Sequence, residues 1–210
     1  MPCSSPWPAG DTRGSALLVV VVLAGAMAVL AGTLAVHVLV DWRMTTHQRR
    51  ADQAMLAAES AITLSVDELG RVPAWTDALT GSVTSDYRDG PLVVPLESSG
   101  AVDLAALGVA LQARTHARTA GPNRPQWRLW LWGDLAALVP LDAPGPWPSV
   151  AVWVADDEDD GDGQPLADTN STVRLQAVAV GPGPEQAWLG ALVRRVGGTD
   201  VEIVTWHRDP

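Results

Sequence analysis

The stretch ALLVVVVLAGAMAVLAGTLAVHVLV, residues 16–40, contains 25 residues without a formal charge at pH 7. A helix of this length rises about 37 Å, and the hydrocarbon core of a bilayer is about 30 Å thick. No other stretch of the 210-residue chain is comparably apolar. The sequence therefore predicts a single membrane-spanning helix, which we place at residues 15–40.

The residues before this run indicate what kind of membrane segment it is. Residues 1–14, MPCSSPWPAGDTRG, are polar, short and rich in proline. A secretory signal peptide has an apolar core of about 7 to 15 residues followed by a small-residue cleavage site. Here the apolar run is longer and leads directly into charged residues. A lipoprotein is disfavoured as well, because nothing apolar precedes Cys3. The pattern favours a retained anchor.

The helical pattern does not stop at the end of the apolar run. Apolar and small residues recur at spacings of three, four or seven as far as Leu69, and charged residues occupy the intervening faces. No proline lies between Pro8 and Pro73, and Gly70 offers a C-terminal stop. We expect one helix of roughly 55 residues, on the order of 80 Å long. Its part over residues 41–70 is amphipathic.

Beyond the helix the pattern predicts a soluble α+β head, residues 71–210. Apolar and polar side chains alternate in several short segments, which is typical of four or five antiparallel strands. These segments cover residues 126–132, 149–155, 172–180, 187–196 and 201–206. The turn sequences at 181–184 and 197–198 indicate a meander, and Asp103 is placed to cap a short helix. We expect a long N-terminal helix packed on a C-terminal antiparallel sheet.

The first part of the chain also carries motifs of a known family. They are Arg13-Gly14 before Ser-Ala-Leu-Leu-Val-Val-Val-Val-Leu, then Trp42-Arg43-Met44, Arg49-Arg50-Ala51-Asp52-Gln53-Ala54 and Ala57-Ala58-Glu59-Ser60-Ala61-Ile62. Residues 13–62 resemble the N-terminal region of PilX-type minor type IV pilins. The resemblance implies a pilin-like fold and a leader, residues 1–14, that prepilin peptidase removes after Gly14. Ser15 would then become the methylated N-terminus.

The same resemblance implies positions that act in the filament. Major pilins carry a glutamate four residues beyond the first mature residue, and Val19 occupies that position here. This departure resembles a subset of minor pilins and the largest minor pseudopilin of type II secretion. Gly25 and Gly32 allow close helix contact, and Glu59 belongs to the Ala-Ala-Glu-x-Ala motif. A subunit without the buried carboxylate fits the filament tip or a scarce interspersed position.

The function that the resemblance implies is structural rather than catalytic, in pilus assembly. The expected partners are other pilins and minor pilins, prepilin peptidase and inner-membrane lipid. The expected location is the inner membrane, with one span and an extracytoplasmic C-terminal domain, and then the pilus at the cell surface. The sequence contains no nucleophile elbow, phosphate loop or HExxH motif. A net charge of −10 argues against nucleic acid as a partner.

Two other functions remain open. One is a minor pseudopilin of type II secretion, whose head usually carries a long helical insertion, whereas the head here is compact. The other is an unprocessed signal-anchor protein with an extracytoplasmic domain that binds calcium or sugars. The positive charges after the span, Arg43, Arg49 and Arg50, would by themselves place the C-terminal side in the cytoplasm, but long domains translocate largely regardless of charge.

Residues 156–163, DDEDDGDG, are the most acidic part of the chain. Glu158, Asp160 and Asp162 stand at alternate positions before a glycine, as in the start of a calcium loop, and Asp168 is a candidate later ligand. An EF-hand would need a carboxylate at its twelfth position, which is Thr169 here. The segment therefore fits either a calcium site or a solvated acidic hairpin tip, which the pattern favours. The fold requires no cofactor, and calcium is the candidate ion.

Ten tryptophans are present in the chain. Several of them lie on predicted strands, where a large aromatic side chain fills a core. These are Trp127, Trp130, Trp132 and Trp153. The alternative is an exposed aromatic platform for carbohydrate, and the strand positions favour the core.

Overall fold

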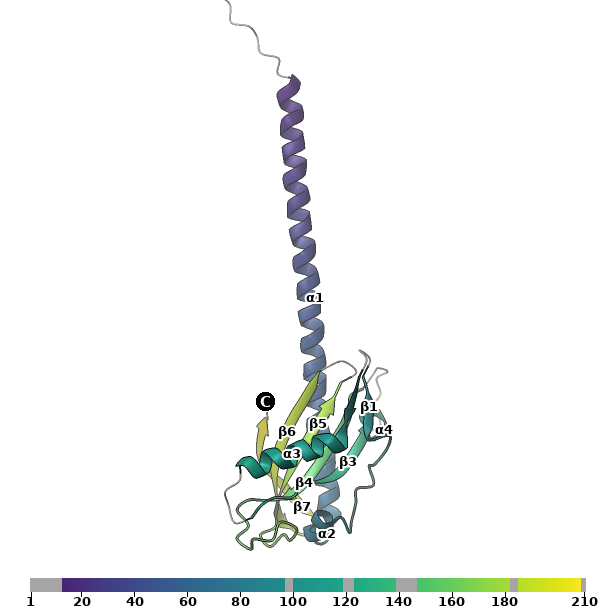
Figure 1. Ribbon diagram of the computed structural model, residues 1–210, viewed down its shortest axis with the longest axis vertical. Coiled ribbons are helices and arrows are strands. Elements are labelled where there is room, and N and C mark those ends of the chain that lie inside the picture. Colours follow the sequence, from purple (N-terminus) through teal and green to yellow (C-terminus); the bar gives the residue numbers. More distant parts are fainter. Residues whose placement is uncertain (1–12, 97–99, 119–122, 139–146, 182–184, 209–210) are drawn as a thin grey trace, which may run out of the picture. The chain divides into compact units, whose positions relative to one another are not determined.

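The computed structural model describes residues 13–96, 100–118, 123–138, 147–181 and 185–208, with side chains from residue 16 onward. Its elements follow the chain in the order helix, small sheet, helix and large sheet (Figure 1). They are α1 (Arg13–Arg71), α2 (Trp75–Thr80), β1 (Val93–Pro95), β2 (Ala101–Asp103), α3 (Leu104–Arg118), β3 (Arg128–Asp134), α4 (Leu135–Leu138), β4 (Ser149–Asp156), β5 (Thr172–Val180), β6 (Gln186–Gly197) and β7 (Asp200–Arg208).

The chain divides into two compact units, one ending at Thr46 and one beginning at His47, and α1 contributes to both. We call them the N-terminal unit and the C-terminal unit and describe each by itself. The predicted leader falls almost entirely on residues 1–12, which lie outside the described residues. The predicted long helix is confirmed, with 59 residues in α1.

The C-terminal unit is built on a five-stranded antiparallel sheet in the order β3-β4-β5-β6-β7. Each strand pairs with its neighbour in the chain, so the sheet is a meander, as the turn sequences predicted. A separate pair, β1 and β2, forms a small antiparallel sheet. The predicted α+β class is therefore confirmed.

The C-terminal part of α1 covers one face of this sheet. Its inward side is made largely of alanine, which lets the helix approach the strands closely. The fully or almost fully buried residues of this face are Ala54, Ala57, Ala58, Ala61, Ile62, Ser65 and Leu69. They pack with inward valines and leucines of β4 and β5, such as Val152 and Leu175, in one core. The amphipathic pattern of residues 41–70 serves this contact.

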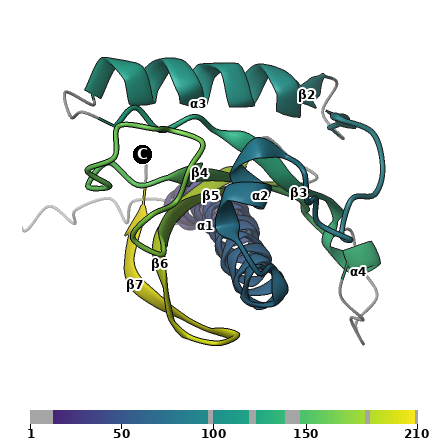
Figure 2. The same cartoon turned by 90° about the horizontal axis from the view of Figure 1, so that it is seen from below.

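The helix α3 covers the opposite face of the sheet, so the strands lie between two helical layers (Figure 2). Leu104 and Leu111 of α3 pack with Trp153 and Val178 of the sheet in a second core. As predicted, the Asp103 side chain caps this helix, and its Oδ1 accepts from the backbone N–H of Ala105 at 2.8 Å. Both faces of β4 and β5 are consequently buried.

A β-bulge changes the predicted alternation of β3. The sequence placed Trp127, Leu129 and Leu131 on one side, but the register shifts between Leu129 and Leu131. Leu131 and Trp130 therefore both pack into the core under α1, whereas Trp127 and Leu129 pack toward α3. The prediction of strict alternation is wrong at this point. The extra residue of a bulge cannot be read from a hydrophobic pattern.

The C-terminal end of α1 is held by Arg195 of β6. The Nη1 atom of Arg195 donates to the carbonyl oxygen of Pro73 at 2.8 Å, and its Nη2 atom donates to the carbonyls of Leu69 and Val72. The guanidinium of this residue, Arg195, lies 4.8 Å from the ring centre of Trp75. A cation at a helix C-terminus satisfies free carbonyls and opposes the negative end of the helix dipole.

Candidate functional site

The N-terminal unit consists, in its described residues, of the first part of α1. All side chains from Ala16 to Val40 are exposed, and the segment is long and apolar enough to cross a membrane. This is consistent with a single membrane span or a signal sequence. An exposed apolar surface of this extent is rare on a soluble monomer, so it marks a membrane or protein contact.

The predicted filament positions lie on this exposed surface. Val19 is 65% exposed, and a Cβ atom added at Gly25 or Gly32 would meet nothing within 4 Å. Both glycines therefore leave shallow, open places on the helix where another backbone could approach. Gly14 and Ser15 lie in the first turn of α1, and the Ser15 side chain lies outside the part of the chain whose side chains are described.

Glu59 lies in the C-terminal unit, on the side of α1 that does not face the sheet core. Its side chain is exposed, and together with Met55 it lines a groove of about 250 Å³ against β6 and β7. Leu189, Trp206 and Arg208 form the other side of that groove. The residue is therefore accessible to a neighbouring molecule.

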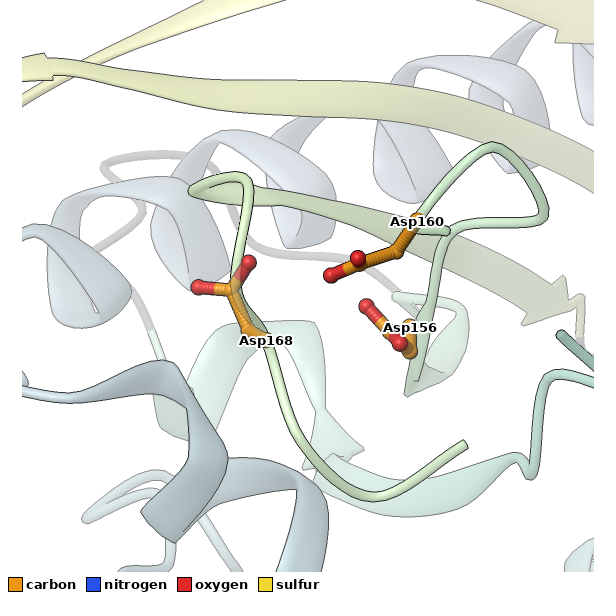
Figure 3. A group of neighbouring side chains, drawn as sticks. All are labelled: Asp156, Asp160 and Asp168. Atoms are coloured by element: carbon orange, nitrogen blue, oxygen red, sulfur yellow. The ribbon is translucent and has the colours of Figure 1, made fainter. Parts of the chain in front are cut away.

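A group of three carboxylates forms a candidate metal site in the C-terminal unit. Asp156 is the last residue of β4, whereas Asp160 and Asp168 belong to the connection between β4 and β5. One oxygen atom of each lies within 4.8 Å of the others, and the three side chains are neighbours (Figure 3). This cluster could hold a metal ion such as calcium.

Side-chain hydrogen bonds fix the shape of the loop around this cluster. Asp160 accepts from the Thr169 hydroxyl at 2.6 Å and from its backbone N–H at 2.8 Å. Asp168 accepts from the backbone N–H of Thr172 at 3.1 Å. The amide of Asn123 donates to Asp156 Oδ2 at 2.6 Å. The loop therefore holds its carboxylates in place from several directions.

Burial and hydrogen bonds shift the pKa values of these acids in opposite directions. Loss of solvent raises the pKa of Asp156 to about 7, against the effect of the hydrogen bond from Asn123, and the neighbouring charges of Asp160 and Asp157 raise it further. Burial also raises the pKa of Asp157 and of Asp168. For Asp160, burial acts in the same direction, but the hydrogen bonds from Thr169 outweigh it and lower the pKa.

The structure brings only part of the predicted ligand set together. Asp160 and Asp168 belong to the cluster, and the third member is Asp156 rather than Glu158 or Asp162. Glu158 forms an ion pair with Arg174 of β5. Asp162 accepts from the backbone N–H of Gln164 at 2.7 Å and so closes a tight turn. The alternate spacing of a calcium loop does not describe this segment.

The tryptophans of the sheet serve mainly the two cores. Trp130 and Trp153 are 3% and 2% exposed. The other two predicted core residues are half-buried and lie beneath cations: Arg174 is 5.8 Å from the ring centre of Trp127, and Arg88 is 4.3 Å from that of Trp132. These four therefore form no exposed aromatic platform.

No protein-family model matches the chain, and no curated protein or solved structure matches it either. The architecture itself is pilin-like: a long N-terminal helix whose first part is apolar and whose last part packs on a C-terminal antiparallel sheet.

Proposed function

We propose that this protein is a membrane-anchored structural subunit of a type IV pilus or a related filament, of the PilX-type minor pilin kind. One observation carries the proposal: a single helix, α1, joins a fully exposed apolar segment to an alanine-rich segment buried on a five-stranded sheet. The motifs over residues 13–62 support it. The protein acts by assembly and has no catalytic role.

The apolar segment gives the subunit two alternative environments. As a monomer, the segment lies in the inner membrane, and the C-terminal unit lies outside the cytoplasm. In a filament, the same surface exchanges lipid for the helices of other pilins. Gly25 and Gly32 permit close approach there, because neither has a side chain that would hold a neighbouring helix away.

The first mature residues determine where the subunit lies in the filament. Prepilin peptidase removes the leader after Gly14, and Ser15 becomes the N-terminus. With Val19 in place of a glutamate, the subunit cannot form the ion pair that registers a major pilin on its neighbour. The tip, or a scarce interspersed position, therefore suits it better than the shaft does.

We also propose that the C-terminal unit binds calcium. The cluster of Asp156, Asp160 and Asp168 supports this, because hard divalent cations prefer carboxylate oxygens. Calcium does not distinguish the filament role from that of an unprocessed signal-anchor protein, since both can carry the same head. The state of the N-terminus does distinguish them.

The experiment is to determine the mass and the thiol content of the chain purified from its natural host through a C-terminal tag. We expect a polypeptide that begins at Ser15 and contains no thiol, because the only cysteine, Cys3, leaves with the leader. A Gly14→Leu variant serves as the control and should keep both its full mass and its thiol. A wild-type chain that still begins with Met1 would exclude the pilin role.

A minor pseudopilin of a secretion system is the nearest alternative and would give the same N-terminus. The partner proteins separate the two functions. Cross-linking of membranes followed by mass spectrometry should capture pilins in the first case and pseudopilins in the second. In the described residues of the C-terminal unit, the sheet face opposite α1 is covered by α3, a helix of only 15 residues, and this compactness favours the pilin.

A further inference from the structure

Two oxygen atoms near the end of β4 are buried without a hydrogen-bond partner among the described residues. They are Asp156 Oδ1 and Asn123 Oδ1, and both side chains have an exposed fraction of 0%. Buried acceptors almost always have a donor, because nothing else compensates for their lost hydration. These two unpaired acceptors therefore indicate a ligand that is either a cation or a hydrogen-bond donor.

The orientation of the Asn123 amide is fixed by its neighbours. Its nitrogen lies 2.6 Å from Asp156 Oδ2 and 2.8 Å from the carbonyl oxygen of Asp157. Both neighbours can only accept while Asp156 is ionised, so the nitrogen must face them and Oδ1 remains an acceptor. Asn123 thus satisfies one oxygen of Asp156 and leaves the other, Oδ1, for a ligand.

The spacing of the three carboxylates selects the size of that ligand. Calcium binds oxygen at about 2.3–2.6 Å, so two oxygens on one calcium ion can lie up to about 5 Å apart. Magnesium binds at about 2.0–2.1 Å, which limits the same separation to about 4.2 Å. The oxygens of the cluster lie within 4.8 Å of one another, which is inside the calcium limit and exceeds the magnesium limit.

We propose that one calcium ion binds between Asp156, Asp160 and Asp168 and ties the β4–β5 connection to its surroundings. The inference rests on the proposed calcium binding and adds the ligand set and the effect. Asp168 is linked to α2, because its backbone N–H donates to Thr76 Oγ1 at 3.1 Å. Asp156 is linked to the segment before β3 through Asn123. The ion therefore restrains three separate segments of the C-terminal unit.

The test compares matched variants of the full chain in detergent micelles by calorimetric titration with calcium chloride. Asp156→Asn and Asp168→Asn keep the shape of the side chain and remove its charge, so we expect calcium affinity to fall at least about tenfold in each. Glu158→Gln and Asp162→Asn remove the same charge from the same loop outside the cluster. These two should stay within about twofold of the wild type.

The outcomes separate the inference from the function on which it rests. Absence of calcium binding by the wild type at millimolar concentration would overturn both. Binding that Glu158→Gln and Asp162→Asn weaken as strongly as Asp156→Asn would overturn only the ligand set, because it would indicate diffuse attraction by the whole acidic run. A melting curve of each variant in chelator shows that it is folded. The two cluster variants, Asp156→Asn and Asp168→Asn, should lose calcium affinity alike.

Hydrogen exchange tests the restraining effect independently of affinity. Calcium should slow amide exchange in residues 156–172 and also in α2 and around Asn123, by at least about threefold if the ion stabilises these segments by about 0.7 kcal/mol. Asp156→Asn should abolish this protection, whereas Asp162→Asn should keep it. Protection confined to residues 156–172 in the wild type would overturn the link to α2 and Asn123.

Discussion

The two halves of α1 differ in whether their apolar side chains are exposed or buried. In the N-terminal unit, Leu30 is 63% exposed, as are its neighbours of similar size. In the C-terminal unit, Ile62 is fully buried against the sheet, although Leu56 on the outer side of the helix is 62% exposed. The sheet of the same chain covers the apolar side of the second half. The first half needs a membrane or another molecule to cover it.

Hydrophobicity alone therefore does not show which part of a helix stabilises the fold. Among the described residues, the more apolar half buries no side chain within the protein, and the alanine-rich half carries the packing of the fold. Substitutions in the first half should change the location and assembly of the protein. Substitutions in the second half should change its stability.

The largest expected effect is on stability, from Ile62→Ala. Removing a buried branched side chain leaves a cavity between α1 and the sheet and should lower the free energy of unfolding by about 2–5 kcal/mol. Leu56→Ala, on the outer side of the same helix, is the matched control and should cost less than about 0.5 kcal/mol. Thermal unfolding followed by near-ultraviolet circular dichroism measures both. Equal losses would show that the two sides of the helix are equivalent.

The next effect concerns location rather than stability. A charge at the centre of a membrane helix costs about 2.5–3.5 kcal/mol on insertion scales, so Leu30→Arg should shift the protein out of the membrane fraction. The melting temperature of the C-terminal unit should not change, because Leu30 belongs to the other unit. Leu56→Arg, at a position of equal exposure, should leave the membrane fraction unaltered. A shift by both variants would contradict the assignment of the span.

A further effect depends on pH and is confined to the C-terminal unit. The pKa of Asp156 is raised to about 7 in the folded state, from 3.8 in the unfolded chain. The folded state then holds a proton that the unfolded state has lost, so stability falls as the pH rises from about 4 to about 7. For Asp156 alone, this shift corresponds to a loss of about 4 kcal/mol in chelator. The raised pKa values of Asp157 and Asp168 act in the same direction, and the lowered one of Asp160 opposes them.

Urea unfolding at a series of pH values, with the calcium chelator present, measures this effect. Asp156→Asn cannot lose a proton there and should flatten most of the dependence. Calcium should also remove it, by stabilising the ionised form of the cluster. A stability that rises with pH over the same interval would contradict the burial of Asp156.

The smallest expected effect on stability concerns the C-terminal end of α1. Arg195→Met keeps the stem of the side chain but loses its bonds to the carbonyls of Leu69, Val72 and Pro73. The free energy of unfolding should fall by about 1–2 kcal/mol. Arg194→Met is the neighbouring control: its exposed ion pair with Glu202 should contribute less than about 1 kcal/mol. Urea unfolding distinguishes them, and equal effects would exclude the capping role.

The sequence predicted the main elements because their patterns are long. The five strands and α1 each repeat a period over enough residues to be recognised. The short elements α2, α4 and the β1–β2 pair were not predicted, since tertiary contacts rather than local pattern define them. The position of α3 on the second face of the sheet was missed too. The continuous apolar run VAVWVA, residues 150–155 of β4, is the sequence signal that could have indicated it, because a strand covered on both faces is apolar on both sides.

The candidate metal site could be predicted only in part, for a related reason. The acidic composition of residues 156–163 pointed to the loop that carries the cluster, and Asp160 and Asp168 belong to that cluster. The choice among the acids depends on how the loop turns, which local spacing does not give. Glu158 forms an ion pair with Arg174 on the adjacent strand, and Asp162 accepts a hydrogen bond from the backbone N–H of Gln164. Asp156 joins the cluster because it ends β4 with its side chain buried.

The most direct test of the contrast between the two halves is the accessibility of matched cysteines at Leu30 and Leu56, positions of nearly equal exposure in the isolated chain. Each cysteine is introduced singly, together with Cys3→Ser. Cells whose outer membrane is permeabilised and whose inner membrane is intact are then treated with a membrane-impermeant maleimide. We predict rapid labelling at position 56 and protection at position 30, both in membranes and in sheared filaments. Equal labelling at the two positions would contradict the account, because it would show that nothing covers the apolar half of α1.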